Sequence, residues 1–231
     1  MRTLFIAGFG EDDFIFDHIH GCLPGEKRFL NLWSLLPNHP IADLNVAEFA
    51  QELVQRFAIT EQDLIIGHST GGWVALHIKQ ATNCCLVQLA SWTDSRKVVT
   101  PVANRQLIYW VARSGLYLNR FILGQLVKRY YWNKPSREVF TRVFERLISG
   151  KRANAVNHLR LILNPYPYVI SVSPDLRIHA KADRIVRFPD EPVHEVPGDH
   201  FSLYTNPEAV CSVIEHYMKG EYLPKQDLNR L

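Results

Sequence analysis

The chain has 231 residues, 47% of them hydrophobic, and a formal net charge of +3. A chain of this length and composition can bury one sizeable core without disulfides, which excludes a disordered protein and a small disulfide-stapled domain. Its first residues run straight into a predicted strand. They include no apolar stretch long enough for a signal peptide or a membrane span, so we expect a cytoplasmic protein.

Short apolar runs alternate with helical patterns along the chain. Runs with little polar alternation are typical of parallel strands that are buried on both faces. The predicted strands cover residues 3–7, 29–33, 63–66, 84–90, 176–180 and 193–196, and the predicted helices cover residues 46–57, 73–80 and 207–218. Asn45, with Glu48 three residues later, indicates a capped start of the first helix.

The four cysteines are Cys22, Cys84, Cys85 and Cys211. No pair has the spacing of a metal site or of a Cys-x-x-Cys motif, and the adjacent pair falls in a predicted buried strand. We therefore expect ordinary core thiols and no metal.

Residues 95–165, which we call the helical segment, have a helical pattern throughout and an unusual charge. They contain 14 Lys and Arg against two acids, a net charge of +12, whereas the rest of the chain carries −9. A one-sided field of this kind attracts anionic ligands or surfaces. The alternative is a solvated helical face whose cations pair with acids of the core. Aromatic residues interleave with these cations, and we expect most of them in the helix core, with a few lining a pocket or resting on an anionic membrane.

The six residues 67–72, Gly-His-Ser-Thr-Gly-Gly, lie between an apolar run and an amphipathic stretch. This order predicts a strand, a sharp turn and a helix, with Ser69 raised above the sheet in a strained conformation. Gly67 and Gly71 give the turn the space to close, and the amide of Thr70 lies at a helix N-terminus, where it can stabilise an oxyanion. Ser69 is therefore a candidate nucleophile.

A nucleophilic serine needs a histidine base and an acid that orients this histidine. Asp183 and His200 follow Ser69 in the order acid then histidine, each in a loop after a short apolar run. Two other acids, Asp94 and Asp199, are alternatives to Asp183. Asp94 lies just after a predicted strand, and Asp199 adjoins His200 but is poorly placed to reach its Nδ1 atom, so we prefer Asp183.

Four passages of the sequence together resemble the α/β-hydrolase superfamily over nearly the whole chain. Residues 6–10 resemble its oxyanion loop, residues 67–72 its nucleophile elbow, residues 181–186 its acid loop and residues 198–201 its histidine loop. The fold class implied is α/β, a mostly parallel sheet of about six strands with helices on both faces and a helical lid. We expect one domain, 1–231, with a core of residues 1–94 and 166–219, a lid of residues 95–165 and a C-terminal tail of residues 220–231.

The resemblance also implies the roles of individual residues. Ser69 would be the nucleophile, His200 the base and Asp183 the orienting acid, with the backbone amides of Phe9 and Thr70 as oxyanion donors and no metal or organic cofactor. The family often has a histidine where Ala7 stands and a proline where Arg187 stands. For substrate binding we expect four side chains near the nucleophile or in the same loops, those of Phe9, His68, Trp92 and Phe201.

The sequence thus predicts an esterase or thioesterase that forms an acyl-enzyme on Ser69. The basic helical segment favours an acyl group attached to an anionic carrier or head group, such as coenzyme A, an acyl-carrier protein or a phospholipid, and leaves peripheral membrane contact open. No nucleic-acid recognition motif accompanies the cations, so nucleic acid is not expected. The alternatives are a carbon–carbon hydrolase or cofactor-free lyase of the same fold, or a catalytically silent binding protein, which we disfavour because the triad is intact.

Overall fold

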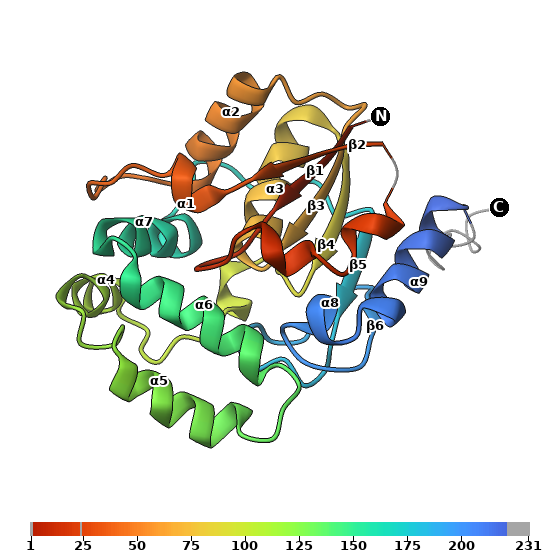
Figure 1. The fold of residues 1–231 in the computed structure, drawn as a ribbon. Coiled ribbons are helices and arrows are strands. Elements are labelled where there is room, and N and C mark those ends of the chain that lie inside the picture. The colour runs from red at the N-terminus through yellow and green to blue at the C-terminus, as the bar shows by residue number, and fades with distance from the viewer. Residues whose placement is uncertain (1, 24, 221–231) are drawn as a thin grey trace.

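The computed structural model describes residues 2–23 and 25–220. Within them, six strands form one sheet in the order β2-β1-β3-β4-β5-β6, and every neighbouring pair is parallel (Figure 1). The strands are β1 Arg2–Ile6, β2 Glu26–Leu30, β3 Leu64–His68, β4 Cys85–Leu89, β5 Leu176–His179 and β6 His194–Glu195. The predicted α/β architecture, with about six parallel strands, is confirmed.

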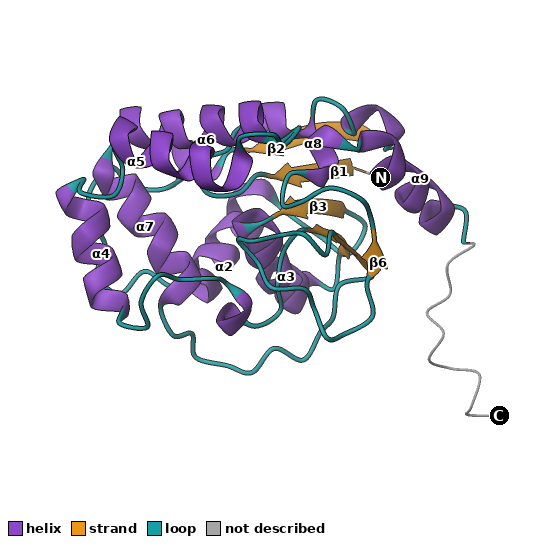
Figure 2. Ribbon diagram, turned by 90° about the horizontal axis from the view of Figure 1, so that it is seen from below, coloured by secondary structure: helices purple, strands orange, loops and turns teal. Residues whose placement is uncertain are grey.

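Alternate residues of the strands enter two separate cores, because successive side chains of a strand point to opposite faces of the sheet. Leu4 and Ile6 of β1 pack toward α2 (Val46–Phe57) and α3 (Thr70–Thr82), whereas Phe5 packs toward α9 (Pro207–Met218). Figure 2 shows the strands between these layers, with α2 and α3 on one side. Both faces of the sheet are therefore covered, as the unalternating apolar runs predicted.

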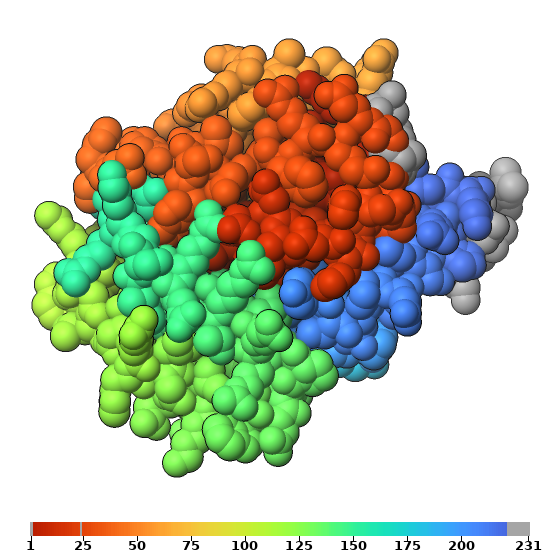
Figure 3. Space-filling view, in the orientation of Figure 1, coloured from red at the N-terminus to blue at the C-terminus, as the bar shows by residue number. Residues whose placement is uncertain are grey.

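The helical segment lies between β4 and β5 in the chain. It forms α4 Arg105–Ser114, α5 Arg120–Leu126, the π-helical turn Val127–Tyr131, α6 Arg137–Ser149 and α7 Arg152–Leu163, after a short 3₁₀ turn at Ser95–Lys97. Helix α7 packs on α3 and on α4, and α6 packs on α5. Figure 3 shows this part of the chain as a continuous mass at one side of the molecule.

Local predictions hold best where a cap fixes the element. Helix α2 has the predicted bounds, and its Asn45 side chain accepts a hydrogen bond from the amide of Glu48 at 3.0 Å. The predicted strand at residues 29–33 has the wrong bounds. Strand β2 begins three residues earlier, at Glu26, and Leu32–Leu35 form helix α1 instead. The Asn31 side chain accepts from the Trp33 amide and so starts a helical turn.

The expectation of four core thiols is wrong for two of them. Cys22 ends the 3₁₀ turn His20–Cys22, lies beside α9 and forms a disulfide with Cys211, across 189 residues of sequence. Cys84 and Cys85 are free thiols.

The remaining short elements are the 3₁₀ turn Asp13–Phe16 and helix α8 Ser202–Thr205. Across the described part of the chain, no helix has the length and apolarity needed to cross a membrane. The predicted tail of residues 220–231 lies outside the described residues from position 221 on.

Candidate active site

Ser69 stands at the corner between β3 and α3 in a backbone conformation that is rare for a residue with a side chain. Its φ is +52° and its ψ is −124°. Such a conformation costs roughly 1–3 kcal/mol and persists only where the surrounding structure enforces it. Here the Ser69 amide donates to the carbonyl of Leu89 at 3.0 Å, and the Ser91 hydroxyl donates to the Ser69 carbonyl at 2.7 Å. The corner is therefore held at both the amide and the carbonyl of Ser69, by the last residue of β4 and by Ser91 just after it.

Two glycines make this corner possible by removing a side chain where backbones approach closely. A Cβ atom on Gly71 would overlap the carbonyl oxygen of Ile6 at the end of β1. A Cβ atom on Gly67 would lie 2.5 Å from the Cα atom of Gly72. Any larger residue at either position would push α3 away from the sheet and displace Ser69.

His200 lies in the loop before α8, and its ring is almost fully buried. Its Nδ1 atom lies 2.8 Å from the Asp183 carboxylate, which fixes the tautomer and leaves Nε2 as the basic nitrogen. Burial alone would lower the pKa of His200, but the charge and hydrogen bond of Asp183, together with the charges of Glu11 and Asp199, outweigh this, so the pKa of His200 is raised.

Asp183 is held by a second histidine and by two backbone amides. One carboxylate oxygen accepts from the amides of Ile185 and Val186 at 2.7 and 3.0 Å, and the other lies 3.1 Å from Nε2 of His179. Burial would raise the pKa of Asp183, but His200 and the hydrogen bond from His179 lower it well below its usual range. Asp183 is thus an ionised acceptor in a fixed position.

Glu11 is a second buried carboxylate beside Ser69, and no sequence motif predicted it. One of its oxygens accepts from the Gly8 amide at 2.6 Å and lies 2.8 Å from Nδ1 of His68. The Nε2 atom of His68 lies 2.9 Å from the carbonyl of His200. This chain of contacts joins the loop after β1, the residue before Ser69 and the loop that carries His200.

The acceptors around His68 determine where its protons lie. The His200 carbonyl can only accept, so Nε2 of His68 carries a proton and donates it. One further proton is then shared between Nδ1 of His68 and the Glu11 carboxylate, which makes the two a proton-sharing pair of zero net charge. Glu11, His68 and His200 also place possible metal-ligand atoms within 4.8 Å of one another. These hydrogen bonds account for that closeness without an ion.

The two predicted oxyanion donors lie in the loop after β1 and at the first residue of α3. Thr70 is the first residue of α3, so no earlier carbonyl of the helix is available to its amide. The side chain of Phe9 is half-buried, and its ring lies 5.4 Å from the ring of His158 in α7. A Cβ atom on Gly8 would lie 2.8 Å from the Cβ atom of Ser69, which shows how closely the loop after β1 approaches Ser69.

The other residues expected in substrate binding are enclosed in this structure. His68 has no exposed side-chain surface, and both of its ring nitrogens are engaged by Glu11 and the His200 carbonyl. Trp92 is buried in the core on the α2 and α3 side, with its ring 6.1 Å from that of Trp73. Phe201 packs edge-on against the ring of His200 and reaches Phe140 of α6. These positions suit support of the site better than contact with a substrate.

The two alternative acids have other partners. Asp94 caps the turn at Ser95–Lys97 and pairs with Arg96, whose hydrogen bond lowers the pKa of Asp94. Asp199 accepts from the Ser136 hydroxyl and from the Phe201 amide. Neither carboxylate has a hydrogen bond to the His200 ring in the described structure.

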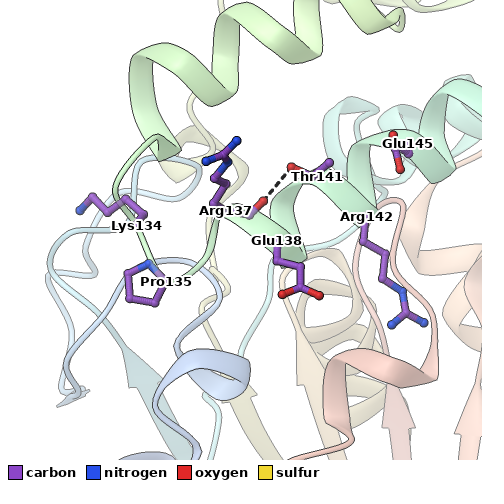
Figure 4. Close-up of a pocket in the computed structure, with 7 residues that line it drawn as sticks. All are labelled: Lys134, Pro135, Arg137, Glu138, Thr141, Arg142 and Glu145. Atoms are coloured by element: carbon purple, nitrogen blue, oxygen red, sulfur yellow. Dashed lines mark hydrogen bonds between the residues drawn. The ribbon is translucent and has the colours of Figure 1, made fainter.

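The site is closed in this structure. Only 6% of Ser69 and 2% of His200 are exposed, and among the described residues no hydrogen bond joins the two side chains. A hollow of about 520 Å³ lies elsewhere, at the start of α6, between Lys134, Arg137 and Arg142 (Figure 4). Ser69 and His200 are thus almost fully enclosed by the surrounding residues.

Comparison with known proteins agrees with this arrangement. The alpha/beta hydrolase family model matches residues 7–213, so the chain belongs to that family. No curated protein sequence matches the chain.

Solved structures share the fold at low sequence identity. A thermophilic esterase from Thermogutta terrifontis is 18% identical, with a TM-score of 0.68, over 96% of this chain and 91% of that one. An enol-lactonase from Burkholderia xenovorans LB400 is 12% identical, with a TM-score of 0.69, over 94% and 91%. An esterase from Exiguobacterium antarcticum is 12% identical, with a TM-score of 0.67, over 95% and 92%. At such identities these likenesses concern the fold alone.

Proposed function

We propose that the protein is a serine hydrolase that cleaves an ester or thioester through an acyl-enzyme on Ser69. The observation that carries this proposal is the strained Ser69 corner, combined with a buried His200 whose Nδ1 atom is bonded to Asp183. Backbone strain of this kind clusters at functional sites. Family membership and the esterases among the similar folds support the same conclusion.

In this mechanism each residue moves or holds a charge. Nε2 of His200 takes the proton of the Ser69 hydroxyl as the oxygen attacks the acyl carbon, and Asp183 stabilises the imidazolium that forms. The amides of Phe9 and Thr70 donate to the oxyanion, where one such donor is worth on the order of 10²–10³ in rate. His200 then gives its proton to the leaving group, and water repeats the sequence to release the acid.

The helical segment would act as a lid over this site. Phe140 of α6 and Tyr131 of the π-helical turn both contact Phe201, which packs on the base. Moving these two residues would loosen the cover next to His200 and admit a substrate. Among the described residues, only Arg96, Lys97 and Arg146 of the 14 Lys and Arg residues in the helical segment form ion pairs. The other cations are therefore available to an anionic group, which supports a substrate whose acyl group is attached to an anionic carrier or head group.

The test is hydrolysis of a panel of esters and thioesters with matched acyl chains, half on neutral and half on anionic leaving groups. We expect turnover by the wild type, none by Ser69→Ala, and a rate on anionic substrates that falls as salt rises, because salt screens exposed charges beyond about 8 Å. No turnover of any ester or thioester would contradict the proposal. Equal salt dependence on neutral and anionic substrates would remove the anionic carrier from it.

A further inference from the structure

The helical segment exposes large apolar side chains between its unpaired cations. Helix α4 buries Tyr109 and Ala112 and turns Leu107, Trp110 and Arg113 outward, three residues apart on one side of the helix. The loop that follows exposes Leu116 and Tyr117. Trp110 is 59% exposed and Leu116 62%, so neither is a core residue that merely reaches the surface.

Helix α5 continues this pattern. It buries Leu123 and turns Arg120 and Phe121 outward, and Phe121 is 72% exposed. We call the exposed set Leu107, Trp110, Arg113, Leu116, Arg120 and Phe121 the aromatic-basic face. Most large apolar side chains that the described structure exposes lie in the helical segment, and Val169 and Met218 are the exceptions. Clustering of this degree marks an interaction surface, since single exposed apolar residues are scattered over ordinary proteins.

From the aromatic-basic face we propose that α4 and α5 dock on an anionic lipid bilayer. Tryptophan and phenylalanine rings enter the boundary between head groups and acyl chains, while arginine and lysine side chains reach anionic head groups beside them. Arg105, Arg113, Arg120, Lys128 and Arg129 are all exposed. In the described structure the ion pairs of the segment belong to other residues, so these cations face outward without an acidic partner.

Other occupants fit this face less well. A second copy of the chain bound about a two-fold axis would set the same patch against itself, and its cations would repel one another. An acidic protein would satisfy the cations, but it offers no reason for four large apolar side chains on the same two helices and their connecting loop. Docking itself does not depend on catalysis. Only the further idea, that bilayer docking brings acyl lipids to Ser69, rests on the proposed function.

The experiment is binding to vesicles by co-sedimentation, using the full chain with Ser69→Ala so that turnover plays no part. Phosphatidylglycerol mixed into phosphatidylcholine is the probe, and phosphatidylcholine alone is the control. We expect binding to the anionic vesicles that falls with salt. Loss of one cation near an anionic surface lowers the partition coefficient roughly fivefold, so reversing Arg113 and Arg120 to Glu should lower it by at least about 25-fold.

Matched variants separate the aromatic-basic face from net charge. Lys27→Glu with Lys219→Glu makes the same change in charge at exposed sites outside the helical segment and should bind almost as the wild type does. Trp110→Ser with Phe121→Ser leaves charge unchanged and should lose most binding, whereas Val169→Ser should not. No binding to anionic vesicles would overturn the proposal. Wild-type binding by the Trp110→Ser and Phe121→Ser variant would overturn it as well. An equal loss of binding in the Arg113 and Arg120 variant and in the Lys27 and Lys219 variant would also overturn it.

Discussion

The pair formed by Glu11 and His68 gives a prediction that can be worked out from the structure. The two side chains are 2% and 0% exposed, and they share one proton across 2.8 Å. Removing one partner of such a buried pair leaves a group without its counter-charge, which costs roughly 3–5 kcal/mol. We expect Glu11→Ala and His68→Ala each to lose about that much unfolding free energy.

The double variant should lose far less than the sum of the two, because neither partner then remains buried alone. A hydrogen bond to a charged group contributes about 1.5–3 kcal/mol, so we expect a coupling free energy of roughly that size. The assay is urea unfolding of the wild type, both single variants and the double variant at neutral pH. The exposed pair of Asp94 and Arg96 is the matched control and should show no measurable coupling.

Additive effects would refute this reasoning. If the double variant loses the sum of the two single losses, to within about 0.5 kcal/mol, the two residues do not act as a pair. Glu11→Gln is informative as well, because its amide can still accept from Gly8 or donate to a neutral His68. We expect it to be markedly more stable than Glu11→Ala.

Three further predictions concern the acid, the base and buried histidines. Asp183→Asn should lower turnover on the order of 10⁴-fold with little change in KM, whereas Asp94→Asn should turn over nearly as the wild type does. If Asp94→Asn had the larger effect, Asp94 and not Asp183 would be the acid that orients His200. Because the pKa of His200 is raised, kcat/KM should rise with pH along an acid limb whose midpoint lies above 6.5, and a midpoint below that value would contradict the assignment. Burial lowers the pKa of His77 and of His158 to about 4, so the folded protein holds each ring neutral, and each costs up to roughly 3 kcal/mol of unfolding free energy as pH falls from 6.5 to 4. When urea unfolding is measured across this pH range, the unfolding free energy of His158→Gln should therefore change less with pH than that of the wild type. An equal pH dependence in the two proteins would contradict this prediction.

The sequence predicted what short-range patterns determine. The turn at Ser69 follows from glycines two residues before and two after it, and α2 follows from its cap at Asn45. Both are local, so spacing along the chain carries the information. The strand predicted at residues 29–33 failed because edge strand β2 is polar and largely exposed over Glu26–Arg28, and such residues carry no apolar signal.

Contacts between distant parts of the chain were not predictable in this way. His68 meets Glu11 across 57 residues and the carbonyl of His200 across 132. Cys22 meets Cys211 across 189 residues. Nothing in the neighbourhood of either partner signals the other, so the sequence predicted neither the Glu11 contact nor the disulfide. The supporting residue His179 had a weak local signal, four residues before Asp183.

The central claim is that Ser69 is an activated nucleophile, and reaction with a fluorophosphonate probe tests it most directly. Mass spectrometry of the labelled wild type should find one adduct, on the peptide that contains Ser69. The Ser69→Ala variant should unfold in urea like the wild type and take no label. An adduct on another residue, a labelled Ser69→Ala variant, or an unlabelled wild type would contradict the account.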